Sequence, residues 1–258
     1  MVPSIHPTAI VSSEAVIGSR VTIGPLVVIE GNVEVGEDTQ LQTGTVLLKG
    51  SRIGARCKIG PYAIIGGLPM DNAYQGEASL AILEDEVELR EFVTVHRATG
   101  KGAETRVGTG SLIMTYTHVS HNVTVGKHTT LATSVQLGGH VQIGDYAFLG
   151  ANALFHQFCR VGTQAIMAGG SATSKDILPY CMAASTPATH YGLNRVGLRR
   201  RGIDGERYAA LEGAIRALRR NDKEKFEELA CHSTDVKVMK QFRDESERGV
   251  ASFATRRP

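Results

Sequence analysis

The sequence predicts an all-β parallel solenoid with three short strands per coil, followed by a small α-helical domain. Three observations indicate this fold. Large aliphatic residues recur at every sixth position, a small or β-branched residue often follows four positions later, and the repeat stops at Pro179, beyond which apolar residues take helical spacing. A period of six fits neither an α-helix nor an alternating strand, whereas three such units form a coil of eighteen residues around a continuous apolar core.

The aliphatic row defines the coils. Its members are Ile5, Val11, Ile17, Ile23, Ile29, Val35, Leu41, Leu47, Ile53, Ile59, Ile65, Leu83, Leu89, Val95, Val107, Ile113, Val119, Val125, Leu131, Leu137, Ile143, Leu149, Phe155, Val161 and Met167. The row is interrupted at residues 67–82 and 98–106, where Gly and polar residues replace the aliphatics. We expect these two segments to be loops that leave the solenoid, and such loops often carry function.

Small residues and glycines complete the pattern. The small or β-branched residues include Ala9, Val21, Val27, Thr39, Cys57, Ala63, Thr117, Val123, Val135, Ala147 and Cys159. Gly occurs 29 times and often follows the aliphatic residue directly, as tight corners require. The four cysteines lack the spacing typical of a zinc site, so we expect buried, reduced thiols at the inward positions.

The C-terminal part of the chain has a different periodicity. Apolar residues at helical spacing include Tyr208, Leu211, Ile215 and Leu218. We therefore expect a solenoid over residues 1–190 and a helical domain over residues 191–258. The helical domain would cover the open end of the solenoid, which would otherwise be an exposed sheet edge.

The bulk composition excludes several classes of protein. Charged residues make up 21% of the chain and the net charge is +2, which indicates neither disorder nor a nucleic-acid partner. No apolar run approaches the roughly 20 residues that span a bilayer, and no secretory signal precedes the repeat. We expect a cytoplasmic protein without a membrane span.

Histidines gather on one face of the predicted solenoid. The units that begin at Val119, Leu137 and Phe155 lie eighteen residues apart, and they carry His121, His140 and His156. Coils are spaced about 4.8 Å apart, and His118 ends the preceding unit at the adjoining corner. A single histidine is more often an ordinary polar wall residue. Four on one patch favour a site in which imidazole acts as a base or a ligand.

Two further features have both a structural and a functional interpretation. The pair Gly138-Gly139 is either a corner or a place where a backbone N–H approaches a developing oxyanion. The basic run Arg199-Arg200-Arg201 is either a solvated turn or a site for a diphosphate or an acidic carrier protein. The sequence pattern does not choose between them.

Several stretches of the chain carry a family resemblance. They are Ile5-His6-Pro7-Thr8-Ala9-Ile10, Met70-Asp71, Tyr74-Gln75-Gly76-Glu77, Val95-His96-Arg97, His118-Val119-Ser120-His121, Gly139-His140-Val141, His156-Gln157-Phe158-Cys159 and Arg199-Arg200-Arg201-Gly202. Together they resemble the UDP-N-acetylglucosamine O-acyltransferases, hexapeptide-repeat enzymes that begin lipid A biosynthesis, and the resemblance covers nearly the whole chain.

The resemblance implies a left-handed parallel β-helix and a homotrimer with sites between subunits. It implies transfer of a (3-hydroxy)fatty acyl group from acyl carrier protein to the 3-position of UDP-N-acetylglucosamine or a close UDP-amino sugar. The carrier protein holds the acyl donor on its phosphopantetheine. No metal and no separate cofactor is implied.

The resemblance also implies roles for individual residues. His121 corresponds to the general base and the Gly139 N–H to the oxyanion donor. The substrate-binding positions are Asp71 near the sugar; His118, His140, His156 and Gln157 along the sugar and acyl sites; Asn122 beside the base; Gly169 at the end of the acyl chain; and Asn194, Arg200 and Arg201 at the nucleotide and its phosphates. Gly at position 169 would leave room for a longer acyl chain.

Four residues depart from the family pattern. Asn122 replaces a common Asp, Ala73 a common Lys, Val196 a common Glu and Met70 a usual Gln. An amide at position 122 can orient the imidazole but gives less charge stabilisation than a carboxylate. Because the departures lie near the sugar, they leave open whether the acceptor is a 3-hydroxyl or a 3-amine. The acyl-chain length also stays open.

Three alternatives compete with this interpretation. One is an acetyltransferase of the same repeat class that uses acetyl-CoA on a nucleotide sugar. Another is a zinc enzyme of the carbonic anhydrase type, with histidine ligands on the solenoid. The last is a scaffold without catalytic activity, in which the histidines could be replaced freely.

Overall fold

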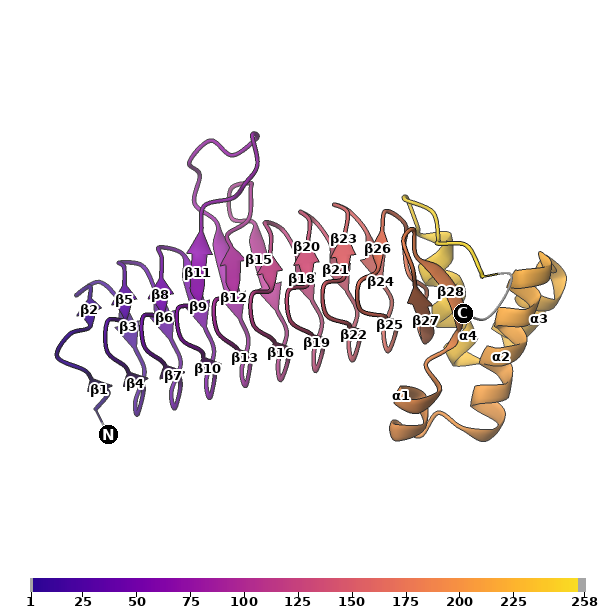
Figure 1. The fold of residues 1–258 in the computed structure, drawn as a ribbon, viewed down its shortest axis with the longest axis horizontal. Helices are drawn as coiled ribbons and strands as arrows, with labels where there is room; N and C mark the ends of the chain where they lie inside the picture. The colour runs from indigo at the N-terminus through magenta and orange to yellow at the C-terminus, as the bar shows by residue number, and fades with distance from the viewer. Residues whose placement is uncertain (1, 255–258) are drawn as a thin grey trace.

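The computed structural model describes residues 2–254, which form a long three-sided solenoid with helices at its C-terminal end (Figure 1). Each coil contributes one short strand to each of three sheets, which contain eleven, nine and eight strands. We call them sheets A, B and C, in the order in which a coil passes through them. All strand pairs within the coils are parallel, which confirms the predicted fold.

The strands are short and regularly spaced. Sheet A contains β1 (Ser4–Ile5), β4 (Thr22–Ile23), β7 (Gln40–Leu41), β10 (Lys58–Ile59), β13 (Glu88–Leu89), β16 (Leu112–Ile113), β19 (Thr130–Leu131), β22 (Phe148–Leu149), β25 (Ile166–Met167), β27 (Cys181–Ala184) and β28 (Thr189–Leu193). Sheet B contains β2 (Ile10–Val11), β5 (Val28–Ile29), β8 (Val46–Leu47), β11 (Ile64–Gly67), β14 (Thr94–His96), β17 (His118–Val119), β20 (Gln136–Leu137), β23 (Leu154–Phe155) and β26 (Ala172–Thr173). Sheet C contains β3 (Val16–Ile17), β6 (Glu34–Val35), β9 (Ser51–Ile53), β12 (Leu80–Leu83), β15 (Glu104–Val107), β18 (Thr124–Val125), β21 (Gln142–Ile143) and β24 (Arg160–Val161).

The register explains the period of the sequence. In sheet B, Val119 pairs with Leu137 and Leu137 pairs with Phe155, so residues eighteen apart stack directly. The second residue of each such strand points into the core, and Val119 is fully buried. The small residue four positions later also points into the narrow interior, as the buried Val123 and Cys159 do. Burial of these side chains in coil after coil is the main stabilising contribution.

The corners of the solenoid have an unusual backbone conformation. The second residue of most turns takes a left-handed conformation, with φ of 57° at Tyr62, 59° at Asn122 and 61° at His140. Side chains at one corner therefore stack along the solenoid. At the corner between sheets A and B, Tyr62, Phe92 and Tyr116 stack in parallel with ring centroids 5.4 and 5.0 Å apart. We call these three exposed rings the aromatic ladder.

Two loops leave the solenoid, and both are shorter than predicted. The large loop, residues 68–79, follows β11 and stands off the solenoid in Figure 1, and the small loop, residues 97–103, follows β14. The expected loops at 67–82 and 98–106 wrongly included the starts of β12 and β15. Both strands pair with parallel neighbours, so Ala81 and Thr105 are buried despite the break in the repeat.

The C-terminal end is closed by a hairpin and four helices. Strands β27 and β28 pair antiparallel, so the expected boundary at residues 190 and 191 wrongly falls inside β28. The helices are α1 (Arg195–Arg200), α2 (Gly205–Arg220), α3 (Lys223–His232) and α4 (Thr234–Asp244). They pack around a second apolar cluster that includes Leu198, Leu211 and Phe226. Residues 255–258 of the predicted helical domain lie outside the described residues.

A buried histidine ties the end of the chain to the solenoid. The Leu178 N–H donates to His190 Nε2 at 2.9 Å, and His190 Nδ1 donates to the carbonyl of Ala251 at 2.9 Å. Burial lowers the pKa of His190 to about 4, so the ring is neutral near pH 7. Both ring nitrogens are thus used in holding the C-terminal segment.

Among residues 2–254, no helix combines the length and apolarity needed to cross a bilayer.

Candidate active site

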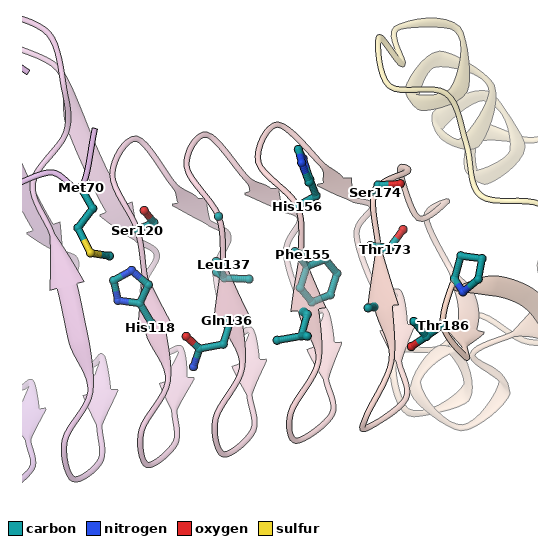
Figure 2. Close-up of a pocket in the computed structure, with 14 residues that line it drawn as sticks. Met70, His118, Ser120, Gln136, Leu137, Phe155, His156, Thr173, Ser174 and Thr186 are labelled. Carbon is teal, nitrogen blue, oxygen red and sulfur yellow. The ribbon is translucent and has the colours of Figure 1, made fainter. Parts of the chain in front are cut away.

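A groove of about 690 Å³ runs along the outer face of sheet B. Its floor includes His118, Gln136, Leu154 and Ala172, the outward residues of four successive strands. Figure 2 shows Met70 of the large loop and His118 at one end of the groove and Thr186 at the other. Most of the lining is apolar, so the groove suits an extended apolar chain with a polar group at the histidine end.

Four residues form what we call the catalytic cluster: Asp71, His121, Asn122 and His140. His121 and Asn122 occupy the turn between sheets B and C after β17, and His140 occupies the same corner one coil later. The rings of His121 and His140 meet edge to face with centroids 5.3 Å apart. The large loop brings Asp71 Oδ2 to 3.7 Å from His121 Nδ1. His121 is only 7% exposed, so these groups meet in a largely dry corner.

The tautomer of the neutral His121 ring follows from its neighbour Asn122. The Asn122 amide nitrogen donates to the Thr99 carbonyl at 3.0 Å, and its Oδ1 accepts the Thr99 N–H at 2.9 Å. The amide is therefore held in one orientation, with Oδ1 toward His121 Nδ1 at 3.0 Å. Because an amide oxygen only accepts, Nδ1 carries the proton and Nε2 has a free lone pair.

The free nitrogen of His121 faces Gly139. A Cβ atom at Gly139 would lie 2.5 Å from both Nε2 and Cε1 of His121, so a side chain there would force the ring or the turn to shift. Residues 121 and 139 stack because they are eighteen apart. Among the described residues, the hydrogen bonds leave the Gly139 N–H without an acceptor. A lone pair and an N–H donor are thus adjacent, as a base and an oxyanion donor must be.

Two more histidines lie beside the cluster on sheet B. Burial, with smaller contributions from His96 and His121, lowers the pKa of His118 to about 4. His118 Nδ1 lies 2.7 Å from Thr94 Oγ1, whereas its buried Nε2 has no partner among the described residues. His96 packs edge to face on His118 at 4.8 Å, and burial lowers its pKa as well. The ring of His118 is therefore neutral near pH 7, and its side chain lines the groove.

The expectation of one patch of four histidines is wrong in part. His121, His140 and His156 occupy three different positions of their six-residue units. They therefore do not stack on one another along the solenoid but lie in neighbouring rows. His156 points into the groove, and its Nδ1 donates to the carbonyl of Gln157 at 3.1 Å. His140 does not line the groove and stacks on Phe158 with centroids 4.6 Å apart. Burial and nearby His121 lower the pKa of His140.

The remaining predicted binding residues lie on other edges of the solenoid. Gly169 is in a turn between sheets A and B, next to the groove face. The guanidinium of Arg201 stacks 3.4 Å above the ring of Tyr146, at the corner between sheets C and A. Arg200 is exposed at the end of α1. The catalytic cluster and the basic run thus occupy different edges of one chain.

Asn194 has a structural role that sequence reasoning missed. Its Oδ1 accepts the Gly197 N–H at 3.0 Å as the cap of α1, and its amide nitrogen donates to the Gln164 carbonyl at 2.8 Å. The side chain is buried and uses these groups within the chain. Sequence reasoning also missed His96 as a site residue. Its signal was present in Val95-His96-Arg97, but the large loop breaks the eighteen-residue count.

The cluster also has a geometry that could bind a metal ion. Asp71, His121 and His140 each offer a ligand atom, and these atoms lie within 4.8 Å of one another. Nitrogen and carboxylate ligands suit zinc, although His121 Nδ1 already donates to Asn122. This set is where the zinc-enzyme alternative would place its metal.

Comparison with known proteins identifies the family. The family model "Bacterial transferase hexapeptide (six repeats)" matches residues 14–49 and 32–67. The model "Udp N-acetylglucosamine O-acyltransferase; Domain 2" matches residues 176–251. An acyl-[acyl-carrier-protein]–UDP-N-acetylglucosamine O-acyltransferase of Halorhodospira halophila is 38% identical over 95% of this chain and 98% of its own length.

Solved structures agree with the sequence relatives. The UDP-N-acetylglucosamine acyltransferase of Francisella novicida superposes with a TM-score of 0.93 at 33% identity, over 97% of this chain and 95% of that one. The enzyme of Campylobacter jejuni gives 0.91 at 33% identity, over 97% of this chain and 100% of that one. The solenoid is a left-handed parallel β-helix, and the chain belongs to the UDP-N-acetylglucosamine O-acyltransferase family.

Proposed function

We propose that this enzyme transfers a (3-hydroxy)fatty acyl group from acyl carrier protein to the 3-position of UDP-N-acetylglucosamine, or of a close UDP-amino sugar, as the first step of lipid A biosynthesis. The relatives are named acyl-[acyl-carrier-protein]–UDP-N-acetylglucosamine O-acyltransferases. The observation that carries the proposal here is the free Nε2 of His121 beside the N–H of Gly139, at the end of an apolar groove.

The proposed reaction begins with His121. Nε2 removes the proton from the sugar 3-hydroxyl as its oxygen attacks the thioester carbonyl. The carbonyl oxygen becomes negative in the tetrahedral intermediate, and the Gly139 N–H donates a hydrogen bond to it. The intermediate collapses with cleavage of the C–S bond. The imidazolium returns its proton to the departing phosphopantetheine thiolate, which restores the neutral base.

The groove gives the acyl chain its place. Leu137, Leu154 and Phe155 supply apolar surface beyond the reacting end, and burial of each methylene contributes about 0.8 kcal/mol. An acetyl group would leave this surface unfilled, so the groove favours a long-chain donor over acetyl-CoA. The basic run Arg199-Arg200-Arg201 near the helical end supplies charge for a diphosphate or for an acidic carrier protein. A reaction on these two substrates belongs in the cytoplasm.

The assembled enzyme is proposed to be a homotrimer with sites between subunits. The catalytic cluster and the Arg201 stack lie on different edges of one chain, so one ligand reaches both most readily across a subunit contact. The exposed aromatic ladder supplies apolar surface of the kind that subunit contacts cover. Phe92→Asp should weaken the assembly without local strain, because Asn152 occupies the equivalent turn with φ of 58°. Light scattering after size exclusion measures the mass.

A donor panel tests the reaction. The purified protein is mixed with UDP-N-acetylglucosamine or its 3-amino analogue, and with acetyl-CoA or acyl carrier protein thioesters of different length. Mass spectrometry should show an acylated UDP-sugar only with carrier-protein thioesters. A product formed from acetyl-CoA alone, or full activity of His121→Ala, would overturn the proposal. The most productive thioester gives the chain length.

A further inference from the structure

The imidazole of His121 has two neighbours of different charge at the same nitrogen. Nδ1 lies 3.0 Å from the neutral Asn122 amide oxygen and 3.7 Å from the Asp71 carboxylate. A base in this corner becomes an imidazolium when it takes a proton. At 7% exposure, water solvates that cation poorly, so a nearby anion stabilises it.

Asn122 can orient the base but cannot balance its charge. Both ends of its amide are held by the backbone of Thr99, and its own N–H donates to Thr105 Oγ1 at 2.8 Å. This rigid amide selects the tautomer with the proton on Nδ1. It carries no net charge, so the charge must come from another element.

Asp71 is placed to supply that charge. The Ala73 N–H donates to Asp71 Oδ1 at 2.9 Å, which leaves Oδ2 toward His121. The hydrogen bond from this N–H is the largest contribution that lowers the pKa of Asp71, so the carboxylate is ionised near pH 7. The titratable groups facing His121 are Asp71 from the large loop, His140 from the next coil, and His118 and His96 from β17 and β14. Asp71 is the anion of this set.

The large loop is braced so that Asp71 stays in place. The Glu77 carboxylate accepts the N–H of Gly100 at 2.6 Å and of Gln75 at 2.7 Å, and Arg97 donates to the Tyr74 hydroxyl at 3.2 Å. The bonds from Gly100 and Arg97 join the large loop to the small loop, which also holds Asn122 through Thr99. The two loops therefore position both partners of His121.

We propose that Asp71 is a positioning residue for the base: it stabilises the protonated His121 in the transition state, while Asn122 holds the ring. A single adjacent carboxylate could both orient the ring and balance its charge. Here the amide of Asn122 in the turn orients the ring, and the carboxylate of Asp71 on the large loop balances the charge. This inference rests on the proposed acyl transfer. It differs from a role in binding the sugar, because the partner of Asp71 is the imidazole.

A set of three variants tests the division of labour. Asp71→Asn keeps the shape and removes the charge, and kcat should fall roughly 100-fold with little change in the KM for the sugar. Asn122→Asp places a carboxylate beside Nδ1, at the loss of the hydrogen bond to the Thr99 carbonyl, and should raise kcat. The double variant Asp71→Asn/Asn122→Asp should regain at least about tenfold in kcat over Asp71→Asn. Glu88→Gln, at a half-buried carboxylate on sheet A, is the matched control and should change neither constant.

Several outcomes would overturn the inference. A raised KM with unchanged kcat in Asp71→Asn would mean that Asp71 binds the sugar. Failure of Asn122→Asp to rescue Asp71→Asn, with both variants folded by circular dichroism, would mean that charge is not its contribution. If the wild-type enzyme transfers no acyl group from any carrier-protein thioester, the proposed function itself fails and the inference fails with it. Activity in the wild type therefore separates the two failures.

Discussion

Two buried histidines in this chain differ in what their Nε2 atoms contact. His190, at the closed end of the solenoid, accepts a backbone N–H at Nε2 and donates to a backbone carbonyl from Nδ1. His121 donates from Nδ1 to Asn122, and its Nε2 faces only Gly139. The first ring is saturated and structural. The second keeps a lone pair beside an open groove, so burial alone does not distinguish a catalytic histidine from a core histidine.

The largest expected effect is on catalysis at His121. His121→Ala should reduce acyl transfer by roughly 10³-fold, because an alcohol without a base is a poor nucleophile. The thermal transition should change little. His6→Ala, at an exposed histidine in the first coil, is the control and should keep full activity. Full activity of His121→Ala would show that this ring is not the base.

The opposite pattern is expected at His190. His190→Ala removes two hydrogen bonds and leaves a void under the C-terminal segment, so the free energy of unfolding should fall by about 3 kcal/mol. Urea titration measures this loss. The folded fraction should keep normal kcat, because His190 lies away from the groove. A variant that is stable but inactive would contradict the distinction between the two rings.

Gly139→Ala sharpens the comparison at the active site. The new Cβ would meet His121 Nε2 at 2.5 Å, so the ring or the turn must shift. We expect kcat to fall by roughly 10²-fold, because both the base and the oxyanion donor are displaced. Gly192→Ala is the matched control, since a Cβ there would meet nothing within 4 Å. Equal activity of the two variants would show that Nε2 need not face this turn.

Acid should weaken the His190 junction. Its pKa is lowered to about 4 in the folded chain, against about 6.5 in an unfolded one. The unfolded state therefore binds more protons as the pH falls below 6.5, and stability is lost toward pH 4. Between pH 7 and pH 5 this single group should reduce the free energy of unfolding by about 2 kcal/mol. Urea titrations of wild type and His190→Gln should differ in slope against pH, and parallel slopes would exclude this group.

The smallest expected effect is that of chelation. If His121 acts as a base, treatment with EDTA followed by gel filtration should leave acyl transfer unchanged. Added Zn²⁺ should inhibit, because Asp71, His121 and His140 can approach one ion and the base would then be blocked. Loss of activity on chelation, with recovery on adding zinc, would instead favour the metalloenzyme alternative.

The fold could be predicted because the hexad pattern is repeated and local. The hexad position of each aliphatic residue predicts that it is buried, and Val119, Leu137 and Phe155 stack as the eighteen-residue coil requires. The bounds of the loops could not be predicted from that count. Ala81 and Thr105 carry little hydrophobic signal, and their burial depends on partner strands on both sides.

The structure brings several of the predicted site residues together, in an arrangement that differs from the expected patch. The resemblance supplied the residues, and the period supplied the face. Whether His121, His140 and His156 converge depends on their positions within each unit, because a shift of one residue at a turn moves a side chain to a neighbouring column. His156 therefore enters the groove, whereas His140 stacks on Phe158.

The sequence by itself determined the solenoid, its coil length, the helical end and the family, since each follows from periodicity or from continuous motifs. Only the tertiary structure decided which nitrogen of His121 is free and which carboxylate faces it. The tautomer depends on Thr99 holding an amide 23 residues away, and the charge depends on a loop that returns from residue 71. Such contacts are made between segments whose separation has no period, so they are settled by loop geometry.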